Sequence, residues 1–255
     1  MAMLADRLET AASGRIDREI HLPNTAKLEL VEFIARELPH WRDHPDRPAA
    51  DAETTLTEHL CGYLNTAVYY SAVWSHVQFQ TETSDEAQRG RKIDLTVKPC
   101  GAVLIVEGRR HSMFDALFPI ECKRLPTPKG RMRDEREYVI TAGGTTGGIQ
   151  RFKFGHHGAE HTFAGMIGYI QDRPIPFWVR QVNGWIMALS GEPGSVWTDS
   201  DLLQPQNSDS GTGLCTLRSC HQRRGGLDDC ELHHMWIGMA QQTRHDERKS
   251  ELSVL

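Results

Sequence analysis

The stretches KIDLTV, residues 92–97, and ALFPIECKRL, residues 116–125, decide the fold of this chain. Each is typical of a β-strand, because the first alternates apolar with polar residues and the second is a short apolar run. Side chains two positions apart on a strand share one face. Glu121 and Lys123 are therefore predicted to be neighbours, with the cysteine between them on the other face. Asp94 is predicted to lie opposite the apolar residues of its own strand.

The segments around these strands predict alternating helices and strands. Apolar stripes at helical spacing predict helices over 24–38 and, with Asp51 as a possible cap, over about 53–72. We expect a loose arm at 1–23, a linker at 40–48 and a Gly/Pro/Arg-rich loop at 125–147. A polar turn separates an expected strand over 75–81 from the one over 92–97, and 102–115 could supply a hairpin insertion. Further expected segments are a helix from about 148, a strand over 164–170, a helix over 174–189, a disordered loop over 195–213, and late strands over 214–221 and 231–239.

These segments predict an α/β fold with a mixed central sheet flanked by helices, an N-terminal helical addition and extra C-terminal strands. The length of 255 residues allows one large domain with additions. We expect an arm and helix over 1–49 and a main domain over 50–240, with its core at 50–172 and an extension at 173–240. The residues from 241 to 255 are expected to form a polar tail.

The composition excludes several protein classes. Hydrophobic residues make up 39% and charged residues 25% of the chain, which is ordinary for a globular protein and excludes a collagen-like fibre, a coiled coil and a fully disordered chain. No run approaches the roughly 20 apolar residues of a membrane span, so no membrane partner is expected. The first residues lack the pattern of a secretory signal. Six scattered cysteines favour a reducing, cytoplasmic setting.

Charge is distributed unevenly along the chain. The formal net charge is −5, yet residues 89–153 hold fourteen Lys/Arg against seven Asp/Glu. A basic middle within an acidic frame indicates an anionic ligand that meets one part of the surface. Chance clustering on a solvated face is the alternative.

Asp94, Glu121 and Lys123 are the residues to which the sequence assigns chemistry. Two carboxylates on adjacent strands can share one divalent cation, and Mg²⁺ is usually held by one or two carboxylates with waters and phosphate oxygens. A lysine beside them can orient or deprotonate a water and offset charge on a phosphate. A second Glu-x-Lys at 247–249 lies in the polar tail, outside any strand pattern. The alternative is a solvent-facing Glu–Lys pair beside an exposed Asp.

The order helix, strand, Asp94-bearing strand, Glu121-x-Lys123 strand, helix, strand over residues 50–172 resembles the PD-(D/E)XK nuclease superfamily, which has the restriction-endonuclease-like fold. Ile93 stands where the superfamily name has Pro. The resemblance implies a Mg²⁺-dependent (Mn²⁺ is possible) nuclease that hydrolyses DNA phosphodiester bonds, in antiviral defence or restriction. Asp94 and Glu121 would bind the metal. DNA is favoured over RNA, and a homodimer or a partner protein could supply target recognition.

A helical glutamate ahead of the first strand is also implied by the resemblance, and two candidates exist. Glu53 extends the apolar stripe of its helix, whereas Glu58 has a more polar flank. We prefer Glu53, which would help to place a second metal or a water. A solvated helix acid is the alternative for either.

Candidate substrate-binding residues lie after the Glu-x-Lys motif. Gln150 and Arg151 open a helix and could face the phosphate. The loop that begins at the motif is basic and could contact the nucleic-acid backbone through Arg124, Lys129, Arg131 and Arg133. An exposed helix start and a mobile solvated loop are the respective alternatives.

Two alternative functions belong to other classes. One is a catalytically inactive nuclease fold that binds nucleic acid or protein. The other is a zinc-stabilised binding module acting through a partner, because zinc-ligand residue types recur near the C-terminus, namely Cys215, Cys220, His221, Cys230, His233 and His234. Their spacing lacks a CxxC, so ordinary strand packing is favoured for them.

Overall fold

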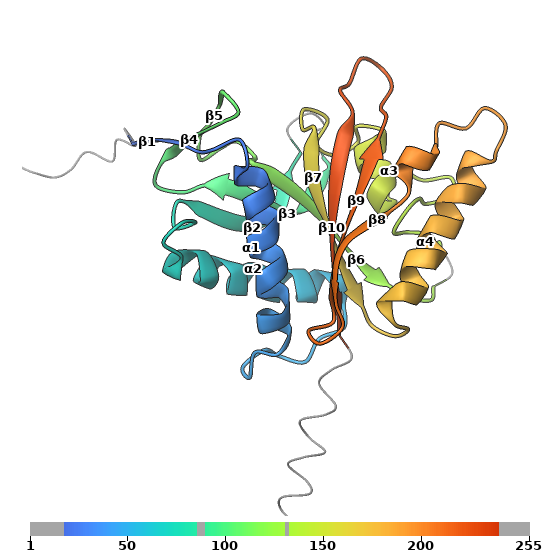
Figure 1. Ribbon diagram of the computed structural model, residues 1–255, viewed down its shortest axis with the longest axis horizontal. Coiled ribbons are helices and arrows are strands. Elements are labelled where there is room, and N and C mark those ends of the chain that lie inside the picture. Colours follow the sequence, from blue (N-terminus) through green and yellow to red (C-terminus); the bar gives the residue numbers. More distant parts are fainter. Residues whose placement is uncertain (1–17, 86–89, 131–132, 240–255) are drawn as a thin grey trace, which may run out of the picture.

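The structure is a computed structural model in which residues 18–85, 90–130 and 133–239 are described. These residues form a mixed α/β architecture with helices on both faces of a central sheet (Figure 1). The helices are α1 (Ala26–Arg42), α2 (Glu53–Tyr70), α3 (Gly148–Lys153), α4 (Ile175–Ser190) and the 3₁₀ turn η2 (Asp199–Asp201). The sheet strands are β2 (Val77–Ser84), β3 (Lys92–Pro99), β6 (Phe118–Leu125), β7 (Phe163–Ile170), β8 (Gln204–Asp209), β9 (Leu214–His221) and β10 (Cys230–Gly238).

The central sheet is parallel in its middle and antiparallel on both sides. Its strand order is β2-β3-β6-β7-β10-β9-β8. The strands β6, β7 and β10 are parallel neighbours, whereas β2–β3, β3–β6, β10–β9 and β9–β8 pair antiparallel. The connection from β6 to β7 passes through α3, which places this helix beside the strand that carries Glu121 and Lys123. The strands expected over 75–81 and 92–97 are present as β2 and β3, which pair antiparallel.

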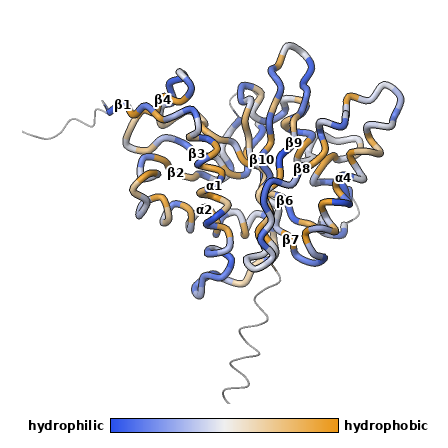
Figure 2. The backbone as a smooth tube through the Cα atoms, viewed as in Figure 1, coloured by the Kyte–Doolittle hydropathy of each residue, from blue (hydrophilic) through white to orange (hydrophobic). Residues whose placement is uncertain are grey.

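Two apolar cores lie on the two faces of the sheet. Helices α1 and α2 belong to one core and α3 and α4 to the other. Side chains alternate along each strand between the two cores. In β6, Ile120 and Cys122 point to the α2 core and Leu125 points to the α3 core. Figure 2 shows hydrophobic segments gathered along the strands, whereas the loop between β9 and β10 is hydrophilic. Glu121 and Lys123 alternate with Cys122 and therefore share the α3 face.

A second, small sheet joins the N-terminal segment to the middle of the chain. The hairpin expected at 102–115 exists, as β4 (Val103–Val106) and β5 (Arg109–His111). It does not join the central sheet, because β4 pairs with β1 (Glu19–His21) instead. The prediction of a loose arm over 1–23 is therefore wrong at β1, and residues 1–17 lie outside the described residues.

Two further sequence expectations are corrected by the fold. The segment 195–213 is not a disordered loop: it contains η2 and β8, and Asp201 within it is fully buried. Every residue of β8 is exposed, so the strand has no apolar alternation and only its pairing with β9 reveals it. Asp51 does not cap α2 either, since the cap position is Ala52 and no side chain bonds there. The polar tail expected over 241–255 lies outside the described residues.

Across the described ranges, none of the helices combines the length and apolar character needed to cross a membrane.

Candidate active site

The site lies where β3 and β6 separate. Their ladder ends at the pair Leu95–Ile120, so the backbone of β6 beyond this point has no β3 residue paired with it. Carboxylates take the place of the missing strand: the amide of Cys122 donates to Asp94 Oδ2 at 2.9 Å, and the amide of Arg124 donates to Glu53 Oε2 at 3.1 Å. Unpaired buried amides are costly, so these carboxylates stabilise the end of β6. The same bonds bring Asp94 and Glu53 to the Glu121–Lys123 strand.

The ammonium of Lys123 is the centre of the site. Its Nζ atom lies 2.9 Å from Glu121 Oε1, 3.0 Å from Glu53 Oε1 and 3.5 Å from Asp94 Oδ2. The side chain of Lys123 is 6% exposed and that of Glu121 is 0% exposed, whereas Asp94 and Glu53 retain 22% and 25% exposure. The structure therefore brings together all four residues that the sequence singled out for catalysis. One edge of the group, formed by Asp94 and Glu53, is open to solvent.

The backbone opposite Asp94 is unusual. Glu82 has φ of 53°, in the left-handed region that residues other than glycine rarely adopt. The β2–β3 ladder pairs Thr81 with Leu95 and Thr83 with Ile93, but the pair of Glu82 with Asp94 between them is missing. Such local strain concentrates at functional sites. It marks the position of Asp94 as a break in an otherwise regular sheet.

The far side of Glu121 is covered by two cationic or titratable groups. Arg151, from α3, donates a hydrogen bond to Glu121 Oε1. His157, which is 2% exposed, brings Nδ1 to 3.2 Å from Glu121 Oε2. Sequence reasoning named Arg151 as a possible phosphate contact, and the structure instead directs it at the buried carboxylate. His157 was missed, because no local pattern distinguishes it from the histidine before it in the sequence.

The electrostatic environment separates the two strand carboxylates. Burial raises the pKa of Asp94 to about 7, and the charge of Glu121 adds to this effect against the opposing charge of Lys123. Burial would also raise the pKa of Glu121, but Lys123, His157 and Arg151 outweigh it and lower the pKa to about 2. Lys123 loses favourable hydration on burial, yet the three carboxylates raise its pKa well above its ordinary value. At neutral pH, Glu121 is thus an anion, Lys123 a cation, and Asp94 is poised between its two forms.

A small cleft leads to Asp94 from solvent. It is lined by Glu53, Glu58, Asp94, Glu82 and three threonines, and its volume is about 20 Å³, enough for one water-sized group. Glu53 and Glu58 both face this cleft, but Glu53 is the one bonded to Lys123 and Arg124. The geometry therefore favours Glu53 of the two candidate helical acids.

The residues suggested for substrate binding have different environments. Gln150 is buried, and its amide oxygen accepts from the backbone of Thr141 and Gly147 while its nitrogen donates to Gly144 O. It therefore holds the preceding loop and does not face the group around Lys123.

The basic loop is partly open to solvent. Arg124 donates a side-chain hydrogen bond to Asp51 O, whereas Lys129 and Arg133 are exposed. Arg131 lies outside the described residues.

The donor set fits Mg²⁺ better than zinc. Asp94 and Glu121 are two hard oxygen donors that both contact one cation, Lys123, and Mg²⁺ typically takes one or two carboxylates and fills the remaining positions with water and phosphate. Structural zinc requires four ligands and catalytic zinc three. In the part of the chain that the structure describes, no three His, Cys, Asp or Glu side chains are grouped to hold a metal ion. A Mg²⁺ ion at the two carboxylates would compete with the ammonium of Lys123.

The cysteines and histidines near the C-terminus are dispersed by the strands that carry them. Cys215 and Cys230 are buried, whereas Cys220 is exposed. His221 and His234 lie in a buried hydrogen-bond chain, and His233 pairs with Glu231 at 2.6 Å. This arrangement is strand packing and polar bonding, which the sequence favoured over zinc.

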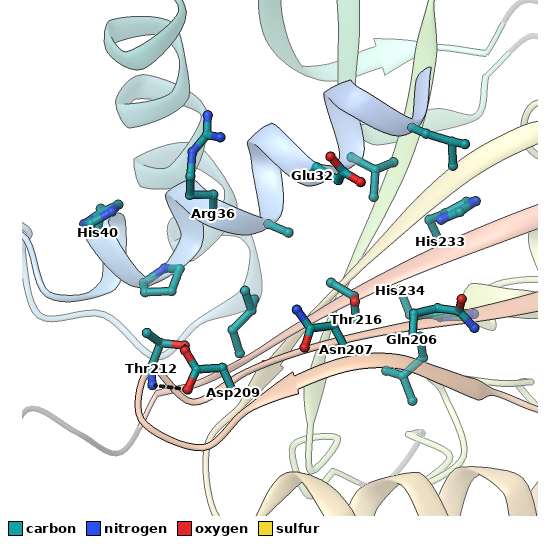
Figure 3. Close-up of a pocket in the computed structure, with 16 residues that line it drawn as sticks. Glu32, Arg36, His40, Gln206, Asn207, Asp209, Thr212, Thr216, His233 and His234 are labelled. Atoms are coloured by element: carbon teal, nitrogen blue, oxygen red, sulfur yellow. Dashed lines mark hydrogen bonds between the residues drawn. The ribbon is translucent and has the colours of Figure 1, made fainter. Parts of the chain in front are cut away.

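A wider groove lies elsewhere on the molecule. Its volume is about 590 Å³, and Figure 3 shows α1 on one side and strands β8–β10 on the other. The groove is lined by both apolar and polar side chains, among them Leu28, Leu217, Glu32, Arg36 and Asn207. It shares no lining residue with the group around Lys123.

Comparison of the chain with protein-family models, with curated proteins and with solved structures finds no match. The function proposed below therefore depends on this chain's own residues and on the resemblance of its motif.

Proposed function

We propose that this protein is a Mg²⁺-dependent nuclease with a restriction-endonuclease-like fold, and that it hydrolyses phosphodiester bonds of DNA. The convergence of Asp94, Glu121 and Glu53 on the ammonium of Lys123, at the point where β3 and β6 separate, is the observation that carries the proposal. The antiparallel β2–β3–β6 strands, followed by α3 and the parallel strand β7, agree with the resemblance.

Asp94 and Glu121 would hold the metal, which when bound polarises the scissile phosphate and makes a hydroxide available near neutral pH. The charges of the site suit a cation. The raised pKa of Asp94 reflects a carboxyl whose charge Lys123 and the Cys122 amide only partly stabilise. Glu121 is an anion at neutral pH and is held in place by Arg151 and Lys123. Glu53, on the open edge, would orient a water.

Lys123 would act as a cation and not as a base. In the metal-free protein, the charges of Glu121, Asp94 and Glu53 raise the pKa of Lys123 and keep its amine protonated near neutral pH. An ammonium beside the reacting phosphate instead offsets the negative charge that builds up in the transition state. Of the two roles that the sequence allowed for this lysine, the electrostatic one is therefore proposed.

The exposed basic side chains of the loop after β6 would contact the nucleic-acid backbone. Lys129 and Arg133 are exposed and follow the site directly in the chain. Replacing both with alanine should weaken DNA binding and lower the salt slope of log affinity by about 0.9 for each phosphate that is no longer neutralised. Fluorescence anisotropy at a series of salt concentrations measures this slope, and an unchanged slope would assign these residues to the solvated surface.

Incubation of the purified protein with plasmid, single-stranded DNA and RNA, each with Mg²⁺ or EDTA, tests the activity. We expect cleavage of DNA with Mg²⁺ and none with EDTA. Asp94→Asn and Glu53→Gln are the informative variants, since each keeps an oxygen that can accept from the β6 amide and removes only the charge. No cleavage by the wild-type protein, with Mg²⁺-independent binding of nucleic acid, would favour the inactive binding module.

A further inference from the structure

A continuous chain of buried side-chain hydrogen bonds runs beside the site, from Trp236 to Lys153. Trp236 Nε1 donates to Tyr138 Oη at 2.7 Å, and Tyr138 Oη lies 2.8 Å from His234 Nδ1. Ser219 Oγ bridges His234 Nε2 at 2.8 Å and His221 Nε2 at 2.7 Å. We call this group the buried polar chain; its members, all 2% exposed or less, are Trp236, Tyr138, His234, Ser219, His221, Asp201 and Lys153.

The buried polar chain ends at an ion pair between Asp201 and Lys153. His221 Nδ1 lies 2.5 Å from Asp201 Oδ1, and Lys153 Nζ is 2.9 Å from both carboxylate oxygens of Asp201. Lys153 also donates to the backbone oxygen of Gln222 at 3.2 Å. Buried charges require this degree of pairing.

The donor and the acceptor can be assigned for every hydrogen bond of the buried polar chain. Burial lowers the pKa of both His221 and His234, so each imidazole is neutral and has one N–H. The carboxylate of Asp201 can only accept, so His221 has its N–H on Nδ1 and its Nε2 accepts from Ser219. The oxygen of Ser219 then accepts from His234 Nε2–H, and His234 Nδ1 accepts from the hydroxyl of Tyr138. All of these donors and acceptors are satisfied, so removal of one link leaves buried polar atoms without a partner.

Asp201, His221 and Ser219 have the order of a serine-hydrolase triad, but this arrangement does not suit catalysis. A nucleophilic serine must present a free Oγ to substrate. Ser219 is 2% exposed, its proton goes to His221 and its oxygen accepts from His234. The buried polar chain is therefore expected to have a structural role, which depends on the elements that it connects.

The buried polar chain holds both ends of α3. At the C-terminal end, Lys153 belongs to the helix itself. At the N-terminal end, the backbone oxygen of Tyr138 accepts from the amide of Ile149 at 3.0 Å. Between these two attachments lies Arg151, whose guanidinium bonds to Glu121 in the candidate active site. Gly148 packs directly against Lys123, because a Cβ atom added there would lie 3.4 Å from Lys123 Cγ.

We propose that the buried polar chain fixes α3 against the sheet and so holds Arg151 on Glu121, which makes Ser219, His221, Asp201 and Tyr138 positioning residues for the hydrolysis proposed above. The six-residue helix cannot hold its own place, since isolated helices of this length are not stable in water. The role in catalysis rests on the proposed function, whereas the placement of α3 does not.

Hydrogen exchange of the α3 amides tests the placement without any need for activity. Tyr138→Phe removes one hydroxyl and keeps the ring, and Ser219→Ala breaks the middle link. Each should speed exchange of the amides at 148–157 about tenfold, the scale of losing a buried hydrogen bond. The matched control is Asn65→Ala, which removes two bonds to the backbone of Phe79 on the α2 side and should leave α3 exchange unchanged. Unchanged α3 exchange in both chain variants would overturn the inference.

Cleavage kinetics test whether the chain acts through Arg151. In Tyr138→Phe and Ser219→Ala we expect kcat to fall about tenfold with KM little changed, because the residues proposed to contact the substrate backbone, Lys129 and Arg133, lie outside α3. In an Arg151→Ala background the same substitutions should have no further effect on kcat. Equal losses with and without Arg151 would overturn the positioning role. If the wild-type protein cleaves nothing but α3 exchange responds as expected, the proposed function fails and the placement of α3 stands.

Discussion

The ammonium of Lys123 balances the charge of the site, and in the proposed function it also assists hydrolysis. It is buried among three carboxylates, and removal of one partner from such a group leaves uncompensated charge. We expect Lys123→Ala to lower the free energy of unfolding by about 3 kcal/mol and to reduce cleavage by roughly 10²-fold or more. Urea unfolding and initial cleavage rates measure the two effects.

Mg²⁺ should rescue part of the stability lost in Lys123→Ala, because the ion no longer competes with the ammonium. The rise in Tm on adding Mg²⁺ should therefore be larger in this variant than in the wild-type protein. Lys129→Ala, at an exposed position, is the control and should respond to Mg²⁺ like the wild type. An equal Mg²⁺ response in Lys123→Ala and wild type would argue against a shared cation site.

Asp94 gives the metal-free protein a specific pH dependence. Its pKa is raised to about 7 by burial and by Glu121, so between the unfolded value near 4 and pH 7 the folded state binds more protons. This group therefore lowers stability as pH rises through that window. Asp94→Asn removes the charge and keeps an acceptor for the Cys122 amide. In EDTA, the variant should gain more Tm relative to wild type at pH 8 than at pH 5, and an equal gain at both values would contradict the assignment.

Two glycines in regular elements have opposite surroundings, and alanine at the two positions should change stability in opposite directions. On β7, a Cβ atom at Gly168 would lie 2.6 Å from the ring of Trp236, whereas a Cβ atom at Gly62 of α2 meets nothing within 4 Å. Gly168→Ala should destabilise the fold by about 2 kcal/mol through overpacking. Gly62→Ala should stabilise it by about 1 kcal/mol through helix propensity. Chemical denaturation of both variants checks these opposite signs.

The elements that sequence patterns predict well are those with an apolar periodicity of their own. α4 and β7 have a bounded apolar pattern, and the predicted ranges of both lie within two residues of their observed ends. β8 was missed because all six of its residues are exposed and polar. The separate pairing of β4 was also missed, since the choice between two sheets depends on where the N-terminal segment lies and not on the strand's own residues.

Buried neutral histidines make the stability of the fold depend on pH in the acid range. Burial lowers the pKa of His221 and His234 below the unfolded value of about 6.5. Below pH 6.5 the unfolded chain takes up protons that the folded chain excludes, so stability is present above this value and is lost as pH falls. The loss should be about 1.4 kcal/mol per pH unit for each histidine that stays neutral.

Asp94 changes stability with pH in the opposite direction to the histidines. Its contribution is the same in wild type and in His234→Gln, so the difference between the two proteins isolates the effect of His234. Urea unfolding between pH 7.5 and 5.5 should show a shallower pH dependence in the variant. Parallel curves for the two proteins would mean that His234 titrates normally in the folded state.

Local sequence patterns were enough to predict the class of the fold and the part of the site that lies on one strand. Strand periodicity alone places Glu121 and Lys123 on one face, and apolar stripes place helices before and after the strands. These are properties of neighbouring residues, which a chain pattern records directly. The shared strand face of Glu121 and Lys123 therefore follows from the amino-acid pattern alone, whereas the choice of Asp94 as their partner also relied on the family resemblance.

The balance of charges in the site depends on contacts between distant parts of the chain, which local patterns do not predict. His157 at Glu121 and the chain from Trp236 to Lys153 join residues from five elements and two loops, and the position of each depends on how the sheet is ordered. Charge stabilisation falls off within a few ångströms, whereas the residues concerned lie up to 98 positions apart in the chain. No periodicity in the sequence encodes such contacts, because they are fixed by the packing of α3, β9 and β10 against one another.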